Sequence, residues 1–227
     1  MLNIMDIKKQ HAWYNIKWFK RMAPVYDFVE IFVASLRKKV AKRIHKQKAK
    51  ILDMACGTGN QSIAFANKNH SVVGVDLSPD MLRYAKKKVK SSHDITFVCG
   101  DATKISYPDA YFDVSSISFG LHDMPEEIGI MILREMIRTT KPDGQIIIVD
   151  YHKPKNKIIA WLGFRIAKLW ESKYYDHFMR VGLNYYLDKV GLKAVGKEAH
   201  LLGNAQIVEC TNKKWGGEAH KLLKSIF

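Results

Sequence analysis

The stretch Ile51-Leu52-Asp53-Met54-Ala55-Cys56-Gly57-Thr58-Gly59-Asn60 is the strongest indication of fold in this 227-residue chain. A short apolar run ends in an acidic residue, and a glycine-rich turn follows before a helix-like segment. Gly57 and Gly59 lack a Cβ, so the backbone can turn tightly and approach a ligand closely. Free backbone N–H groups at the start of the next helix point into the same space. The stretch therefore predicts a nucleotide-like cofactor at the carboxyl end of a strand.

The residues around this turn indicate which cofactor it binds. A dinucleotide-binding fingerprint, G-x-G-x-x-G, needs a third glycine at the position that Ser62 occupies. Asp53, four residues before the first glycine, would repel a pyrophosphate but would attract an ammonium or sulfonium group. The string from Leu52 to Gly59 resembles motif I of the class I S-adenosylmethionine (SAM) methyltransferases. We therefore predict SAM as the cofactor and S-adenosylhomocysteine (SAH) as its product.

Apolar runs alternate with helix-like segments along the chain, which predicts βαβ units and a parallel sheet. Two later apolar segments are expected to close the sheet as an antiparallel hairpin. The predicted fold is α/β and Rossmann-like, with a mostly parallel seven-stranded sheet, helices on both faces and an N-terminal helical extension. The expected strands are residues 50–54, 72–76, 95–99, 112–118, 145–150, 193–200 and 205–211, and the expected helices are about 60–68, 79–90 and 126–139.

We expect one catalytic domain. Residues 1–48 are predicted to form its basic helical extension and acceptor lid, and residues 49–227 its SAM-binding part, with an aromatic insertion at about 153–180. The three cysteines are scattered and no His/Cys cluster has metal spacing, so reduced thiols and no metal are predicted. No apolar run reaches about 18 residues, and the start lacks a signal-peptide pattern. A cytoplasmic location is therefore expected.

Polar residues follow the ends of the expected strands, where ligands bind in open α/β sheets. Asp76 closes the second strand and can accept hydrogen bonds from both ribose hydroxyls. Asp101 follows the third strand and can accept from an adenine amino group, and Ser118-Phe119-Gly120 follows the fourth, near the reacting methyl group. Each aspartate alone could instead be a helix cap or part of a solvated turn. Their spacing over successive βα units favours a common SAM site.

Longer stretches resemble the ubiquinone/menaquinone-biosynthesis branch of the class I SAM methyltransferases. They lie within residues 18 to about 152 and comprise Asp53 to Asn60, Val75 to Leu82, Gly100-Asp101-Ala102, Ile117 to Leu121, Lys141 to Gly144 and an upstream Ala23-Pro24-Val25-Tyr26-Asp27 box. The resemblance implies that Asp53 and the two glycines hold the methionine part of SAM. It also implies that Asp76 holds the ribose, while Met81 and Asp101 contact the adenine. The predicted SAM-binding residues are Tyr26, Asp53, Ala55, Gly57, Gly59, Asp76, Leu77, Met81, Asp101, Ala102, Ser118 and Phe119.

Two departures from this branch both concern the methyl acceptor. The quinone enzymes commonly have Arg-Asn after Phe-Gly-Leu, where this chain has His122-Asp123. Their tyrosine- and proline-containing acceptor segment is not recognisable in the last third of the chain. The resemblance therefore identifies the methyl donor and leaves the acceptor open.

Methyl transfer from SAM is an in-line displacement governed by positioning, and a general base helps where the acceptor must lose a proton. His122 is the predicted base, because its reference pKa is near neutral and it follows the fourth strand. Asp123 is predicted to orient His122, or alternatively to cap the helix after Pro125. Tyr26 is predicted to close over SAM or orient the acceptor. Alternatively, Tyr26 is a buried residue that attaches the N-terminal extension to the core.

Charge suggests a partner surface. Lysine and arginine number 37 against 22 acidic residues, a formal net charge of +15, and thirteen of the basic residues lie in the first fifty. A helical stripe of apolar residues from Val25 to Val40 and an aromatic and basic segment from His11 to Arg21 suit an anionic membrane surface. The stripe could equally cover the core, with the lysines in solvent. The first interpretation predicts peripheral binding to the inner face of a membrane, and the second predicts no membrane contact by this helix.

A second aromatic and basic segment, Ile158 to Trp170, follows the fifth strand. It could be a lid, a membrane-facing patch or a helix packed on the sheet. With Tyr174 and Tyr175 close behind, it predicts an aromatic pocket, which would stack on a quinone ring or attract a methylated ammonium. Tyr151 and His152, directly after the fifth strand, are further pocket candidates.

The predicted function is methylation of a hydrophobic, membrane-derived small molecule. A quinone precursor methylated on carbon comes first, and a phospholipid amine of the phosphatidylethanolamine type is the alternative. The charge would also suit a nucleic-acid methyltransferase, but Ser118-Phe119-Gly120-Leu121 is not the Asn/Asp-Pro-Pro-Tyr/Phe motif of enzymes that methylate base amino groups. The intact donor motif argues against a non-catalytic SAM-binding protein. The methylated atom and the oligomeric state stay open.

Overall fold

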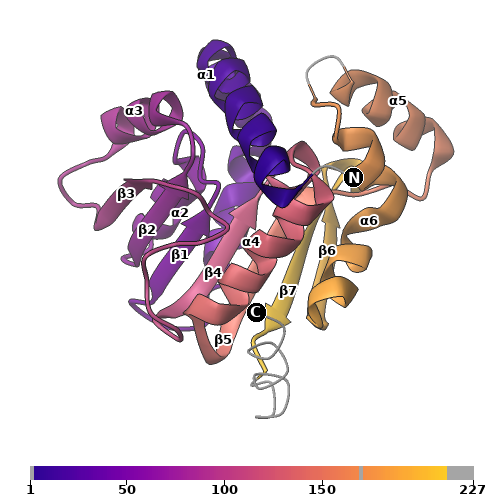
Figure 1. The fold of residues 1–227 in the computed structure, drawn as a ribbon. Helices are drawn as coiled ribbons and strands as arrows, with labels where there is room; N and C mark the ends of the chain where they lie inside the picture. The colour runs from indigo at the N-terminus through magenta and orange to yellow at the C-terminus, as the bar shows by residue number, and fades with distance from the viewer. Residues whose placement is uncertain (1–2, 169–170, 214–227) are drawn as a thin grey trace.

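The computed structural model describes residues 3–168 and 171–213, and for residues 14–32 it describes the helical backbone only. Seven strands form one sheet in the order β3-β2-β1-β4-β5-β7-β6 (Figure 1). β1 to β5 pair in parallel, and β7 pairs antiparallel to both β5 and β6. The strands are β1 Lys50–Met54, β2 Ser71–Asp76, β3 Ile95–Cys99, β4 Phe112–Ser118, β5 Thr140–Tyr151, β6 Ala194–His200 and β7 Ala205–Thr211.

Helices follow β1, β2 and β4, whereas the described residues 100–111 connect β3 to β4 without a helix, and this arrangement confirms the predicted fold class. Local sequence explains where they begin: the Ser78 hydroxyl accepts a hydrogen bond from the Met81 N–H at 3.3 Å, and Pro79 occupies the first helical position of α3. The helices are α1 Ile4–Lys42, α2 Asn60–Ala66, α3 Pro79–Lys88, α4 Glu126–Thr139, α5 Lys157–Ala167 and α6 Tyr175–Val190, with short 3₁₀ turns η1 Leu121–Asp123 and η2 Leu201–Gly203.

The core has two layers because strand side chains alternate between faces. In β5, Ile146 and Ile148 belong to the apolar cluster that includes residues of α4 and α6. Ile147 and Val149 belong to a second cluster, on the other face, that includes residues of α2 and the last turns of α1. β5 is thus buried on both faces, like other central strands of the sheet, which explains the nearly continuous apolar runs in these strands.

The long helix α1 reaches both faces of the sheet. Ile7 packs against the cluster beneath α4, whereas Leu36 and Val40 lie in the cluster on the other face. The predicted N-terminal helical extension is thus present, and it is attached to the core at both ends. The division of the chain at residue 48 stays a prediction.

The expected strands and helices agree with the structure apart from β5 and α6, and α5 is a helix where the sequence left a helix as one of three interpretations of residues 158–170. β5 begins at Thr140, earlier than expected, and it includes Asp143 at φ 59°. Helix α6 was not expected from the sequence, and Gly182, at φ 74° and ψ 163°, interrupts its helical geometry. Within residues 3–168 and 171–213, none of the helices combines the length and apolar character needed to cross a bilayer.

Candidate active site

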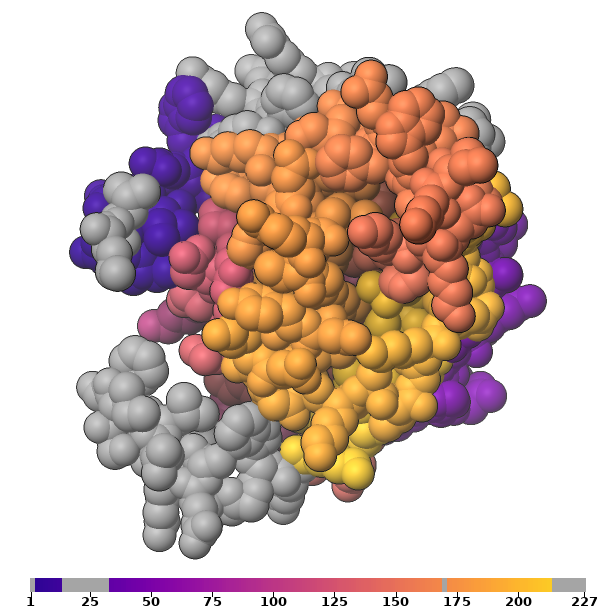
Figure 2. Space-filling model, turned by 90° about the vertical axis from the view of Figure 1, so that its right-hand side faces the viewer, coloured from indigo at the N-terminus to yellow at the C-terminus, as the bar shows by residue number. Residues whose placement is uncertain are grey.

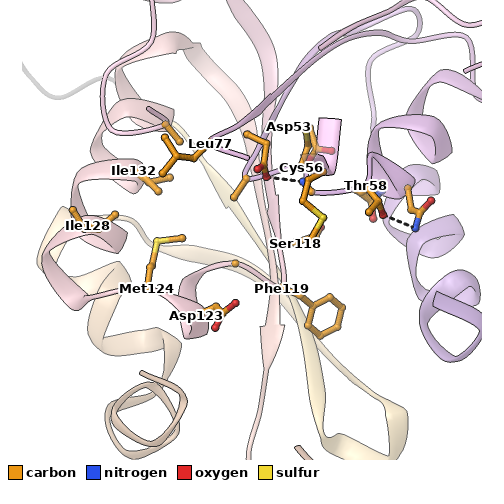
Figure 3. Close-up of a pocket in the computed structure, with 18 of the residues that line it drawn as sticks. Asp53, Cys56, Thr58, Leu77, Ser118, Phe119, Asp123, Met124, Ile128 and Ile132 are labelled. Carbon is orange, nitrogen blue, oxygen red and sulfur yellow. Dashed lines mark hydrogen bonds between the residues drawn. The ribbon is translucent and has the colours of Figure 1, made fainter. Parts of the chain in front are cut away.

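A pocket lies at the carboxyl edge of the sheet, where β1, β2 and β4 end (Figure 3). It encloses about 980 Å³ of empty space, part of it open to solvent. Most of the residues predicted to bind SAM line this pocket together, although they come from separate βα units. The predicted residues that line it are Asp53, Ala55, Gly57, Asp76, Leu77, Met81, Asp101, Ala102, Ser118, Phe119 and Asp123.

The glycine turn adopts the backbone geometry that its composition predicts. Gly57 and Gly59 have φ angles of 54° and 75°, which favour glycine. A Cβ at Gly59 would lie 2.7 Å from Phe97 Cζ, so this glycine allows close helix–strand packing rather than lining the pocket. A Cβ at Gly57 would meet nothing within 4 Å, so the backbone there faces open space. Gly57 is therefore where a ligand can approach the main chain.

Asp76 ties the turn to the second strand. One of its carboxylate oxygens accepts from the Gly57 N–H at 2.7 Å and the other from the Ser78 N–H at 2.8 Å. Burial raises the pKa of Asp76, opposed by these backbone hydrogen bonds. Each carboxylate oxygen retains a lone pair. The group can therefore still accept hydrogen bonds from two vicinal hydroxyls of a bound nucleoside.

Asp53 is a second carboxylate in the same wall. It is almost fully buried and accepts a hydrogen bond from the Ser62 hydroxyl at 2.6 Å. Burial raises its pKa to about 6, opposed first by the Ser62 hydrogen bond and then by the charge of Arg37. A buried carboxylate of this kind favours a cationic ligand group, which would offset the cost of its burial. Ser62 stands where a dinucleotide fingerprint has its third glycine, and here it holds the carboxylate in place.

The opposite end of the pocket combines an apolar surface with one carboxylate. Met81 and Ala102 supply apolar surface that suits a flat ring. Asp101 accepts from the Thr103 N–H at 2.8 Å, and its other oxygen lies 3.1 Å from Lys8 Nζ. Burial would raise the pKa of Asp101, but the hydrogen bonds from Thr103 and Lys8 outweigh it and lower the pKa. Asp101 thus stays ionised and links α1 to this end of the site.

The wall after β4 contains polar atoms without partners. Asp123 is 7% exposed, and its Oδ1 atom has no hydrogen-bond partner among the described residues, which is also true of the Ser118 hydroxyl. Burial raises the pKa of Asp123 to about 6, while the charge of His122 and a hydrogen bond from Ser172 oppose this shift. Phe119, in the same wall, has a φ of 53°, which is unusual for a non-glycine residue.

His122 lies behind this wall and is not among the residues that line the pocket. It is 2% exposed, with Nδ1 2.6 Å from Asp150 Oδ1 and Nε2 2.9 Å from Glu171 Oε2. Burial alone would lower the pKa of His122, but the charges of Asp150 and Glu171 outweigh it and raise the pKa well above 6.5.

This geometry conflicts with the predicted base role of His122. An imidazole that is already protonated and bonded at both nitrogens has no lone pair with which to accept a proton. The predicted roles of Asp123 also change. Asp150 and Glu171 hold His122, and the N-cap of α4 is Pro125, where no side chain provides a cap. Asp123 is thus left as a buried residue of the pocket wall whose Oδ1 atom has no hydrogen-bond partner among the described residues.

Ligand atoms of His122, Asp123 and Glu171 lie within 4.8 Å of one another, so this group could also hold a metal ion. The local sequence contains no signal for such a metal site, because Glu171 is 49 positions from His122.

The other predicted pocket residues, Tyr151 and His152, have different surroundings. Tyr151 donates from its hydroxyl to Glu171 at 2.7 Å, whereas His152 is bonded to the Gly203 carbonyl at 2.9 Å, away from the pocket lining. The side chain of Tyr26 lies outside the described residues.

The lining residues that sequence reasoning missed include three polar ones, His11, Arg37 and Gln61, and the apolar Met124, Ile128 and Ile132. Two of them are on α1, whose basic and apolar pattern gave no reason to separate them from their neighbours. His11 is 7% exposed, and burial lowers its pKa to about 4 against the charge of Asp101. A neutral histidine and an arginine therefore contribute to the pocket from the N-terminal helix.

Comparisons with known proteins agree with this site. Residues 51–144 match the family described as a methyltransferase domain. The chain is 34% identical over 168 residues to the demethylmenaquinone methyltransferase of Paenarthrobacter aurescens (strain TC1), which covers 71% of this chain and 60% of that protein. The corresponding protein of Lactobacillus johnsonii (strain CNCM I-12250 / La1 / NCC 533) is 33% identical over 177 residues, covering 72% and 69%. The chain thus spans only about three fifths of the length of the first of these relatives.

A solved structure has a similar fold. The magnesium protoporphyrin IX methyltransferase of Synechocystis PCC 6803, determined with bound SAH, is 18% identical with a TM-score of 0.63 and covers 84% of this chain and 87% of its own. The sheet order, the donor pocket and the sequence matches together define the class I SAM-dependent methyltransferases, to which this chain belongs. Within that class it falls in the branch of the quinone-biosynthesis methyltransferases.

Proposed function

We propose that this protein transfers the methyl group of SAM to a ring carbon of a hydrophobic quinone precursor at the inner face of a membrane. One observation carries the proposal. The same pocket is lined by two buried donor-side carboxylates, Asp53 and Asp76, and by an acceptor-side carboxylate, Asp123, whose Oδ1 atom has no partner among the residues that the structure describes. The similarity to demethylmenaquinone methyltransferases supports the choice of a quinone precursor.

The donor side fits SAM in the chemistry of its side chains. Asp53 would face the cationic methionine part, and the two oxygens of Asp76 would accept from the ribose hydroxyls. The adenine would lie on Met81, with its edge at Asp101 and Ala102. When bound, SAM supplies a methyl group activated by a cationic sulfur. The pocket's contribution is to hold that methyl group in line with the acceptor.

The acceptor side supports proton removal by Asp123 in place of His122. With a pKa of about 6, Asp123 is mostly ionised at about pH 7, yet it is basic enough to assist. It would take the proton of a hydroquinone hydroxyl, which increases the electron density on the neighbouring ring carbon. That carbon forms the new C–CH₃ bond as the S–CH₃ bond breaks, SAH leaves, and the ring carbon then loses its hydrogen as a proton. His122, held between Asp150 and Glu171, would stabilise the adjacent ionised carboxylate.

A phospholipid amine is the second candidate. Aromatic rings surround His122, with Tyr151, Tyr175 and Phe178 at centroid distances of 4.7, 6.1 and 6.2 Å. A carboxylate beside aromatic rings attracts an ammonium group, and Asp123 could remove its proton before transfer. Such an acceptor also comes from a membrane.

The test is to incubate the purified protein with isotopically labelled SAM and, in separate reactions, a reduced demethylmenaquinone of short side chain or phosphatidylethanolamine. We expect label in the naphthoquinol and equimolar SAH, measured by mass spectrometry. Transfer to phosphatidylethanolamine alone would replace the first candidate with the second. Failure to label either acceptor, by a protein that binds SAM, would refute both.

A further inference from the structure

Exposed apolar side chains gather at one place on the molecule. Six of the eleven large hydrophobic residues that are exposed in the described chain lie on α5 and η2. Figure 2 shows α5 on the face turned toward the viewer, next to the hairpin of β6 and β7. We call this group the α5–η2 surface, and its members are Ile158, Trp161, Leu162, Ile166, Leu201 and Leu202.

The spacing along α5 creates a continuous stripe. Ile158, Trp161, Leu162 and Ile166 recur at helical intervals, and Ile158 and Trp161 are 77% and 64% exposed. Ala167 is buried on the opposite side of the helix. An exposed apolar stripe on an outer helix is unusual, because a solvent-facing side is normally polar. The stripe therefore indicates a surface that meets an apolar environment.

The tip of the β6–β7 hairpin extends this stripe. A Cβ at Gly163 would collide with the side chain of Asn204, so α5 packs directly on the segment that follows η2. Leu202, at φ 57° and 80% exposed, lies in η2, directly before that segment. The two apolar groups thus adjoin, although about 40 residues separate them in sequence.

Basic residues flank the apolar stripe. Residues 153–168 contain Lys153, Lys155, Lys157, Arg165 and Lys168 and no aspartate or glutamate. Lys168 pairs with Asp176 at 2.7 Å. An apolar stripe with tryptophan, bordered by basic side chains, has the composition of helices that lie in the interface of an anionic bilayer. A second copy of this chain would instead place two sets of positive charges against each other.

We propose that the α5–η2 surface inserts into the interface of a bilayer that contains anionic lipids, and that it orients the active site toward that membrane. The sequence suggested membrane contact through the basic N-terminal helix or through residues 158–170. Most of the N-terminal candidates have side chains outside the described residues, and the exposed apolar stripe that the structure describes lies on α5. The surface itself does not depend on the proposed methyltransferase activity. Its use in delivering the acceptor does rest on that proposed function.

Aromatic rings link this surface to the pocket. The ring centroid of Phe164, on α5, lies 5.7 Å from that of Tyr175, and the Tyr175 centroid lies 5.0 Å from that of Tyr151. The ring centroids of Tyr151 and Phe119, a residue of the pocket wall, are 5.7 Å apart. A continuous row of packed aromatic rings therefore connects the α5–η2 surface to the wall of the pocket.

The test measures co-sedimentation of the full-length protein with vesicles of phosphatidylcholine, with and without phosphatidylglycerol. Wild type is expected to bind the anionic vesicles, and the double variant Trp161→Glu/Leu202→Glu is expected to bind at least tenfold more weakly. Val195→Glu is the matched control, because Val195 is 63% exposed on β6, at the end of the hairpin away from η2. A charge-only variant, Lys155→Gln/Lys157→Gln/Arg165→Gln, should also weaken binding and reduce its salt dependence.

Equal binding by wild type and the double variant would overturn the proposal. A loss confined to Trp13→Glu would do the same, because it would place the contact on α1. The charge-only variant keeps the test decisive if the double variant fails to fold, since its three side chains are exposed. Activity on the short-chain acceptor dissolved in detergent separates the two claims. If it is absent from wild type while vesicle binding depends on Trp161, the proposed function fails and the membrane surface stands.

Discussion

Replacing Asp123 with asparagine should remove activity and stabilise the protein at the same time. Asp123 is 7% exposed, and its Oδ1 atom has no hydrogen-bond partner in the described part of the chain, so ionising the carboxyl inside the fold is unfavourable. Its pKa of about 6, against an ordinary value of 3.8, corresponds to a cost of about 3 kcal/mol at neutral pH. Asparagine has nearly the same shape, avoids that cost and can still accept from Ser172.

The sign of the pH dependence follows from the raised pKa. A carboxyl with a higher pKa in the folded state binds its proton more tightly there, so wild type loses stability as the pH rises from 3.8 to about 6. The advantage of Asp123→Asn should therefore be full above about pH 6 and fade below it. For a chain of this length, about 3 kcal/mol corresponds to a rise in Tm of about 6 to 12 °C.

Two assays check this prediction. Thermal unfolding of the SAM-free protein at several pH values should show the rise in Tm, and Asp188→Asn, at an exposed position on α6, is the control for the chemical change itself. Initial rates should fall by about 10²- to 10⁴-fold, and the wild-type rate should increase with pH through about 6. A variant that is no more stable than wild type, or one that keeps its rate, would refute the reasoning.

Two further substitutions test other parts of the site. Gly59→Ala would force a Cβ to within 2.7 Å of Phe97 at a φ of 75°, so we expect a lower Tm and weaker SAM binding, and an unchanged Tm would count against the packing role of this glycine. His122→Asn would leave Asp150 and Glu171 without the imidazolium between them, at a cost of about 3 to 5 kcal/mol in unfolding free energy by urea titration. Because the pKa of His122 is raised in the folded protein, its stabilisation should be complete below 6.5 and decline in alkaline solution. A difference between wild type and His122→Asn that does not change with pH would contradict the ion pairing.

The donor half of the site could be predicted from sequence because its signals are local. The turn from Asp53 to Gly59 and the aspartates at strand ends each depend on a few consecutive residues, and strand period places them at one edge of the sheet. The same reasoning predicted all seven strands, with small differences in their ends.

The acceptor half could not be predicted in the same way, because it depends on contacts between distant segments. The role of His122 changes once Glu171, 49 positions later, supplies its second partner. His11 and Arg37 reach the pocket only because α1 packs at the carboxyl edge of the sheet. Helix α6 was missed because Gly182 breaks its period. The reference pKa of histidine suggested that His122 is a neutral base, whereas in the folded protein two carboxylates from distant segments hold it as a buried, charged residue.

Calorimetric titration with SAM tests the central claim, that the β1–β2 edge of this pocket is the SAM site. Wild type should bind one SAM per chain, and Asp76→Ala should bind at least about 30-fold more weakly, because two hydrogen bonds to a charged acceptor are lost. Asp94→Ala, at an exposed position just before β3, should bind like wild type. Equal affinity of wild type and Asp76→Ala for SAM would contradict the account.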